Sequence, residues 1–274
     1  MKADLHCHTT ASDGLHAPAE VLRMAQAAGV SLLALTDHDT VAGVLALLDD
    51  GGCGGACTLV PGIELSCQWR GQVLHVLGLY IDPRSPVIGD AVVAQLAVRE
   101  QRARRIGQEL GRRGIAGAFE GALAIAGGAV PCRPHFARYL VERGHCRDAA
   151  AAFDRYLGRR HLKGIDRGWP ELNCVVGWIV AAGGIAVLAH PDDYRFTRSK
   201  LGELVQAFQG AGGRAMELAA PGQPEASAVA LERLCREYGL AASVGSDFHG
   251  VGAWRQVGRT RRVPEDLTAV WELV

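Results

Sequence analysis

The chain has 274 residues, of which 49% are hydrophobic and 21% charged, with 29 acidic and 29 basic side chains. This composition is typical of a folded globular protein rather than a disordered one, and the zero formal net charge indicates no general preference for a highly charged partner. The first residues contain no basic stretch followed by an apolar one, and no apolar run is long enough to cross a bilayer, so we expect a cytoplasmic protein without a membrane segment.

Strand-like and helix-like stretches alternate along the chain. Helices are predicted over 18–29, where Pro18 suits a first turn and Gly29 a stop, and over 40–50, 199–212 and 224–239. Buried strands are predicted within residues 2–10, 31–39, 57–65, 72–81, 183–191, 214–220 and 240–249. This alternation predicts an α/β fold with a parallel sheet, either doubly wound or closed as a barrel. Neither of the common glycine-rich phosphate-binding motifs follows the first strand, which argues against a nucleotide-binding fold of those kinds.

The pattern changes between residues 99 and 167, where several helices are predicted and no clear strand. This stretch holds 14 Arg and one Lys against seven acidic residues, whereas the whole chain is neutral. We therefore predict an α/β body formed by residues 1–98 and 168–274, and a basic, helical insertion formed by residues 99–167 that covers the active site.

Histidines and carboxylates recur where the predicted strands end. Because the carboxyl ends of parallel strands meet at one edge of a sheet, these side chains should converge on one face. Side chains two residues apart on a strand point the same way, which groups His6 with His8 and Asp247 with His249. The full set is His6, His8, Asp13, Asp37, His38, Glu64, His75, His190, Asp247 and His249.

Taken singly, these motifs are weak, since most His-x-His pairs bind no metal. Taken together, six of the ten histidines and several carboxylates at strand ends indicate a divalent-metal site. Three ions with about four ligands each need roughly twelve coordination positions. Nine protein ligands, with Glu64 and Asp247 each shared by two ions, and a bridging water would fill them.

The chain resembles the PHP (polymerase and histidinol phosphatase) family of metallophosphoesterases. The matching motifs are DLHCHTTASDG, ALTDHDT, PGIELS, HVLGLYI, GGIAVLAHP and SVGSDFHG, which span residues 4 to 250. The resemblance implies a distorted seven-stranded (βα) barrel with an inserted helical subdomain and three divalent ions. Manganese is the expected metal, with iron(II) and zinc as alternatives.

The resemblance also distributes the ligands. It implies one ion on His6, His8, Glu64 and Asp247, a second on Glu64, His75 and His190, and a third on Asp13, His38 and His249, which Asp247 could also reach. Asp37 has no obvious place among them, and we interpret it as a residue that supports the ligands without binding metal itself, or as a hydrogen-bond acceptor for a loop.

Asp13 distinguishes branches of the family. Histidinol phosphatases usually have a third histidine at this position, whereas the SDG form and the inserted helices resemble the branch that acts on nucleotides. That branch includes 3′,5′-nucleoside bisphosphate phosphatases and 5′–3′ exonucleases of short RNA, and the motif RPHFARYLVERG also resembles it.

We therefore expect a phosphatase that releases a nucleotide's phosphate, in particular the 3′-phosphate of 3′,5′-bisphosphates, by attack of a metal-activated hydroxide. In the insertion, Arg102, Arg105, Arg133 and His135 are predicted to bind the substrate's phosphate groups. No residue identifies itself as the general acid, and no protein partner is indicated.

Other functions stay open at this stage. A histidinol phosphatase and a 5′–3′ exoribonuclease of short RNA would use the same metal ligands. An amidohydrolase also uses His-x-His, although many binuclear members need a lysine at a strand end, and Lys2, Lys163 and Lys200 are not so placed. A degenerate regulatory module that keeps the barrel but has lost its metals is the non-enzymatic alternative.

Overall fold

A computed structural model describes every residue of the chain except 52–56, 159, 163, 221 and 252–254. One seven-stranded sheet contains the strands in chain order. They are β1 (Ala3–Asp4), β2 (Leu32–Leu35), β3 (Thr58–Trp69), β4 (Gln72–Leu79), β5 (Ile185–Leu188), β6 (Ala215–Glu217) and β7 (Ala241–Ser243). All seven predicted strands are therefore confirmed.

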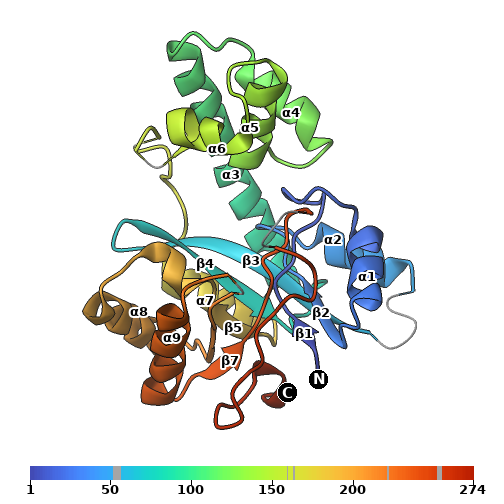
Figure 1. Ribbon diagram of the computed structural model, residues 1–274, viewed down its shortest axis with the longest axis vertical. Helices are drawn as coiled ribbons and strands as arrows, with labels where there is room; N and C mark the ends of the chain where they lie inside the picture. Colours follow the sequence, from blue (N-terminus) through green and yellow to red (C-terminus); the bar gives the residue numbers. More distant parts are fainter. Residues whose placement is uncertain (52–56, 159, 163, 221, 252–254) are drawn as a thin grey trace.

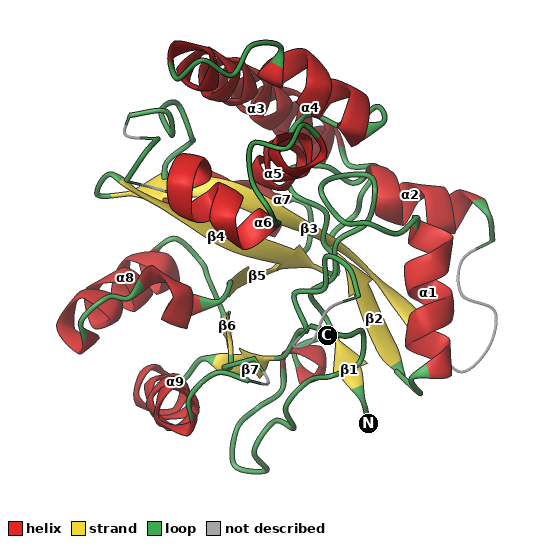
Figure 2. Cartoon of the chain, turned by 45° about the horizontal axis from the view of Figure 1, so that its top comes forward, coloured by secondary structure: helices red, strands yellow, loops and turns green. Residues whose placement is uncertain are grey.

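The sheet curls into a distorted barrel. Figure 2 shows the strands following a curve from β1 to β7, so that the first and last strands approach each other. Backbone hydrogen bonds from Leu5 N to Val244 O (3.0 Å) and from His8 N to Phe248 O (2.8 Å) join the segments that continue β1 and β7. These bonds hold the segment that follows β1 beside the segment that follows β7.

The direction of β4 corrects the expectation of a parallel sheet. β4 pairs antiparallel with both β3 and β5, whereas the other neighbouring strands are parallel. β3 and β4 are joined by Arg70 and Gly71 alone, both with positive φ (47° and 74°). A two-residue turn of this kind makes a hairpin, and it is far too short for the crossover that a parallel pair requires.

Some helices pack around the sheet, and others form a separate group above it in the view of Figure 1. They are α1 (Pro18–Ala27), α2 (Ala42–Asp49), α3 (Pro86–Arg112), α4 (Ala118–Ala126), α5 (Arg133–Glu142), α6 (Ala149–Ala152), α7 (Leu172–Ala181), α8 (Arg198–Gly210) and α9 (Glu225–Tyr238). The four helices predicted by residue range correspond to α1, α2, α8 and α9, and the helices predicted between residues 99 and 167 correspond to the end of α3 and to α4, α5 and α6. Every residue of β5 is buried, as expected for a strand covered on both faces.

None of the helices in the described part of the chain is long and apolar enough to cross a membrane.

The buried apolar residues form two clusters. One, the barrel cluster, is formed by the sheet and by α1, α2, α7, α8 and α9. The other lies among α3, α4, α5 and α6, between Ala103 and Ile165. The 27-residue helix α3 connects them, because Ile88 belongs to the barrel cluster while Ile106 and Leu110 belong to the second cluster. The predicted boundary between residues 98 and 99 falls inside this helix, and the division into two units stays a prediction.

Candidate metal centre and substrate cavity

His6 and His8 follow β1 in an extended segment. Both side chains are fully buried, and their Nε2 atoms lie 3.1 Å apart. Alternation along the segment turns Cys7 the other way, where it belongs to the buried apolar cluster of the barrel. The His-x-His spacing therefore places two imidazole nitrogens at one point inside the barrel mouth.

A tight loop after His8 carries Asp13. The Asp37 carboxylate accepts hydrogen bonds from Thr9 N (2.8 Å), Thr9 Oγ1 (2.8 Å) and Ser12 Oγ (2.6 Å) and thereby holds the loop. A Cβ at Gly14 would lie 2.5 Å from the carbonyl oxygen of His8, so this position requires glycine. Asp37 thus orients the segment that carries Asp13.

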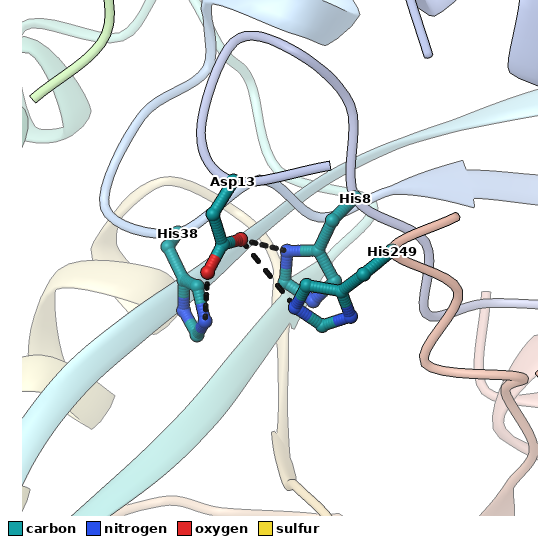
Figure 3. Close-up of side chains that lie close together, drawn as sticks. All are labelled: His8, Asp13, His38 and His249. Carbon is teal, nitrogen blue, oxygen red and sulfur yellow. Dashed lines mark ion pairs between the residues drawn. The ribbon is translucent and has the colours of Figure 1, made fainter. Parts of the chain in front are cut away.

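The loop presents Asp13 to three histidines (Figure 3). Asp13 Oδ1 is 3.4 Å from His249 Nε2 and 3.9 Å from His8 Nδ1. Asp13 Oδ2 is 4.0 Å from His38 Nε2. Three segments distant in sequence therefore point their nitrogen and oxygen atoms at one common position.

Glu64 on β3 lies at the centre of a second group. Its Oε2 is 2.7 Å from His38 Nδ1, and its Oε1 is 3.0 Å from both His75 Nδ1 and His190 Nε2. His75 lies within β4 rather than at the end of a parallel strand. It still reaches the site because β4 runs antiparallel to β5, so that the first half of β4 lies beside the C-terminal end of β5. A hydrogen bond from Ala189 N to His75 O joins the two segments there.

Asp247 follows β7 and faces the two histidines that follow β1. Its Oδ1 is 3.3 Å from His8 Nε2 and 3.5 Å from His6 Nε2. Its Oδ2 forms an ion pair with Arg255. Asp247 and His190 have positive φ (49° and 29°), a backbone conformation that is costly for residues with a side chain and is concentrated at functional sites.

The described residues contain three groups of side chains whose ligand atoms lie within 4.8 Å of one another: His8, Asp13, His38 and His249; His6, His8 and Asp247; and His38, Glu64 and His75. Their imidazole and carboxylate donors suit manganese, iron or zinc. In addition, the buried atoms His8 Nδ1, Asp13 Oδ1 and His190 Nδ1 have no hydrogen-bond partner among these residues. Because unpartnered buried polar atoms are rare, the site fits a cluster of divalent cations.

The electrostatics of the site favour cations. Burial lowers the pKa of His8 to about 3 and that of His75 to about 4, so both imidazoles are neutral, as metal ligands must be. Burial alone would raise the pKa of Glu64, but the surrounding histidines, His38 above all, hold it well below its ordinary value. Burial alone would lower the pKa of His249, but the facing carboxylates of Asp13 and Asp247 raise it to about 9. These carboxylates attract positive charge, which a divalent cation supplies in place of protons.

Glu217 is a residue that the sequence analysis missed. It ends β6, is buried, and places Oε1 2.9 Å from His6 Nδ1. Its Oε2 accepts a hydrogen bond from the backbone amide of His190 (2.7 Å). A proton held at His6 Nδ1 leaves the Nε2 lone pair directed at Asp247 and His8. The only hint of this role in the sequence was a single glutamate within the otherwise mainly apolar strand predicted over 214–220.

A cavity of about 490 Å³ opens above the cluster. Asp13, Glu64 and other members of the cluster form its floor, while Arg102, Arg133 and Phe153 of the helical insertion line it from the other side. Arg102 is oriented by an ion pair with Asp166, which also lines the cavity.

The other two residues predicted to bind substrate lie outside the lining of this cavity. Arg105 donates from Nη1 to the carbonyl oxygens of Ile165 and Arg167 at 3.3 Å each. His135 is buried, and its Nδ1 accepts a hydrogen bond from Cys132 N (2.9 Å) at the start of α5. His135 thus holds the first turn of the helix from which Arg133 projects.

Known proteins resemble this chain along nearly its whole length. No family model matches the chain. A 5′-3′ exoribonuclease of Haemophilus influenzae is 40% identical over 275 residues, covering 99% of this chain and 98% of the relative. A 3′,5′-nucleoside bisphosphate phosphatase of Chromobacterium violaceum is 37% identical over 273 residues, covering 98% of this chain and 94% of the relative.

Solved structures share the fold. One, described as an amidohydrolase from Chromobacterium violaceum with bound sulfate and no metal, superimposes with a TM-score of 0.90 at 36% identity, covering 100% of this chain and 95% of the other. Another, a putative metal-dependent phosphoesterase from Bifidobacterium adolescentis, has a TM-score of 0.78 at 25% identity, covering 99% and 93%.

The barrel and its cluster of histidines and carboxylates define a metal-dependent hydrolase. With relatives of 37–40% identity along nearly its whole length, the chain belongs to the PHP family of metal-dependent phosphoesterases. The alternative of a non-catalytic module is therefore wrong.

Proposed function

We propose that this protein removes the 3′-phosphate from nucleoside 3′,5′-bisphosphates. The observation that carries the proposal is the cavity in which the cluster of histidines and carboxylates faces Arg102 and Arg133. A substrate with two phosphate groups matches this arrangement, with one group at the cluster and the other at the arginines. The relative from Chromobacterium violaceum that is named as such a phosphatase supports it.

The cluster would hold three divalent ions, with manganese expected and iron(II) or zinc as alternatives. His6, His8 and Asp247 would form the first site, Glu64, His75 and His190 the second, and Asp13, His38 and His249 the third. Glu64 lies 3.4 Å from both His6 and His8, close enough to be shared. Such ions would supply Lewis acidity, which stabilises charge on the phosphoryl oxygens and lowers the pKa of a bound water toward neutral pH.

The protein's own groups bind and orient the substrate. The planar guanidinium groups of Arg102 and Arg133 can each donate two hydrogen bonds to the phosphate that is not cleaved. Phe153 and Trp169 line the same cavity and offer apolar surface to the base. Binding energy at this remote phosphate would fix the scissile phosphate over the cluster, which favours reaction by orientation.

A second candidate function is 5′–3′ exoribonuclease activity on short RNA. It is favoured by the Haemophilus influenzae relative, which is the more similar of the two relatives described above. The two activities require the same cluster and differ in whether the cavity's second phosphate belongs to a mononucleotide or to an RNA chain.

The test is a substrate panel with Mn²⁺. Adenosine 3′,5′-bisphosphate, 3′-AMP, a short 5′-phosphorylated RNA and histidinol phosphate are compared by phosphate or nucleotide release. We expect the highest kcat/KM with the bisphosphate and a product that keeps its 5′-phosphate. Faster release from histidinol phosphate, or a product that has lost its 5′-phosphate instead, would refute the proposal. A higher kcat/KM with RNA would favour the second candidate.

A further inference from the structure

A second hollow lies on the helical insertion, outside the catalytic cavity. Its volume is about 540 Å³, and it lies between the C-terminal half of α3 and the segments 160–161 and 164–167. Its lining includes four arginines and one carboxylate, namely Arg105, Arg112, Arg160, Arg167 and Glu109. We refer to this hollow as the arginine groove.

The arginine groove and the catalytic cavity share a wall. On α3, Arg102 lines the cavity while Arg105 lines the groove. On the neighbouring segment, Asp166 lines the cavity while Ile165 and Arg167 line the groove. A chain that leaves the cavity over this wall would therefore enter the groove.

Two of the four arginines of the groove pair with carboxylates, Arg112 with Glu109 and Arg160 with Asp154. Arg105 donates to the carbonyl oxygens of Ile165 and Arg167, which ties the segment to α3. Within the described part of the chain, neither Arg105 nor Arg167 forms an ion pair, whereas Arg112 pairs with Glu109 at 3.1 Å. The groove thus keeps net positive charge, and the Arg112 side chain is 73% exposed.

The chemistry of the groove suits a phosphodiester backbone. Guanidinium groups bind phosphate oxygens through paired hydrogen bonds. The part of the lining that the structure describes contains one ring, that of His161, and no Phe, Tyr or Trp, so contacts to phosphate groups, which are independent of sequence, would dominate binding. At about 1.5 Å per helical residue, Arg112 lies roughly 15 Å along α3 from Arg102, beyond the reach of a mononucleotide bound at the cluster.

We propose that the arginine groove binds the backbone of single-stranded RNA whose terminal nucleotide occupies the catalytic cavity. This inference rests on the proposed function in its RNA form, and it assigns the groove to nucleotides beyond the first. A nucleoside bisphosphate would not reach it.

The first test measures binding without catalysis. A fluorescently labelled, single-stranded RNA a dozen nucleotides long is titrated with the full chain in EDTA, and anisotropy is followed at several salt concentrations. The variant Arg112→Gln/Arg167→Gln is compared with Arg104→Gln/Arg147→Gln, which removes the same charge from the same helical unit outside the groove. We expect the groove variant to bind several-fold more weakly than the control, with a salt dependence reduced by about 1.4 in the slope of log K against log salt. Equal affinities and slopes for the two variants would overturn the proposal.

The second test separates the groove from the catalytic function. The groove variant should keep the wild-type kcat/KM for adenosine 3′,5′-bisphosphate and lose several-fold in kcat/KM for the RNA. An equal loss on both substrates would overturn the assignment of the groove to the longer substrate. If the wild-type chain releases no phosphate from the bisphosphate, the proposed function fails, whereas the binding test still decides the groove.

Discussion

Arg99 of α3 and Asp39, in the loop after β2, form a buried ion pair. Asp39 directly follows His38 and has a φ of 55°, and Arg99 Nη1 donates to Cys132 Sγ at 3.0 Å, one residue before Arg133. Burial alone would lower the pKa of Arg99, but the facing Asp39 raises it, so the guanidinium stays charged. The pair therefore links the segment of His38, a proposed metal ligand, to the segment of Arg133, which we propose binds phosphate.

Replacement of Arg99 by methionine should destabilise the protein strongly. The change leaves the Asp39 carboxylate buried without its charged partner, which costs about 3–5 kcal/mol in the free energy of unfolding. Urea unfolding followed by circular dichroism measures the change. Arg104→Met is the control, because it removes an exposed ion pair with Glu100 on the same helix and should cost less than about 1 kcal/mol. Similar small losses in both variants would contradict a structural role for the buried pair.

Removal of the metal should abolish activity and lower thermal stability. Dialysis against EDTA is expected to stop phosphate release, and added Mn²⁺ should restore it and raise Tm in a concentration-dependent way, because the ions bind only the folded state. His8→Ala should lose both responses while keeping the circular dichroism spectrum of the folded protein. His145→Ala, at an exposed position outside the cluster, is the matched control. An His8→Ala variant with full activity would be incompatible with the proposed metal centre.

Glu217→Gln should weaken metal binding without disturbing the fold. The Glu217 carboxylate is a charged acceptor that holds the proton at His6 Nδ1, and the neutral amide of glutamine holds it less firmly. Loss of a hydrogen-bond partner of a metal-binding histidine typically costs about 10–100-fold in metal affinity. Isothermal titration with Mn²⁺ measures the loss. Glu225→Gln, where the carboxylate is exposed and pairs with Arg261, should bind Mn²⁺ like the wild type. Unchanged affinity in Glu217→Gln would show that Glu217 does not orient His6.

Arg133→Gln should act on binding of the second phosphate. Loss of a charge-assisted hydrogen bond is worth about 1.5–3 kcal/mol, so KM for adenosine 3′,5′-bisphosphate should rise about tenfold or more. KM for 3′-AMP, which lacks that phosphate, should change less than about twofold. Steady-state kinetics with both substrates, and Arg104→Gln as the control, make the comparison. An equal rise of KM for the two substrates would place Arg133 at the cleaved phosphate instead.

Several features of the site could be predicted from the amino-acid sequence. The recurrence of His and Asp or Glu at strand ends depends on two local rules, the alternation of side chains along a strand and the convergence of parallel strand ends. These rules grouped His6 with His8 and brought Glu64 and Asp247 to the same mouth of the barrel. The structure places all of these side chains within reach of one another.

Other features depended on contacts between distant segments. The direction of β4 was set by the short turn at Arg70 and Gly71, and it brought His75 to the site by a different route from the one predicted. Glu217 has no motif around it, and its role follows only from the 2.9 Å approach to His6 across the barrel. Arg102 and Arg105 lie three residues apart on α3, yet the segment 165–167 separates them into two hollows.

The sequence by itself thus determined the succession of seven strands and the residue types that gather at the barrel mouth, because both follow from local periodicity. It also determined the family resemblance, through its six matching motifs. Only the tertiary structure decided which side chains orient the histidines, that Arg99 and Asp39 form a buried pair, and which arginines face the cluster. The physical reason is that hydrogen bonds, buried ion pairs and cavities arise between segments far apart in the chain, and their partners leave no periodic signal in the sequence.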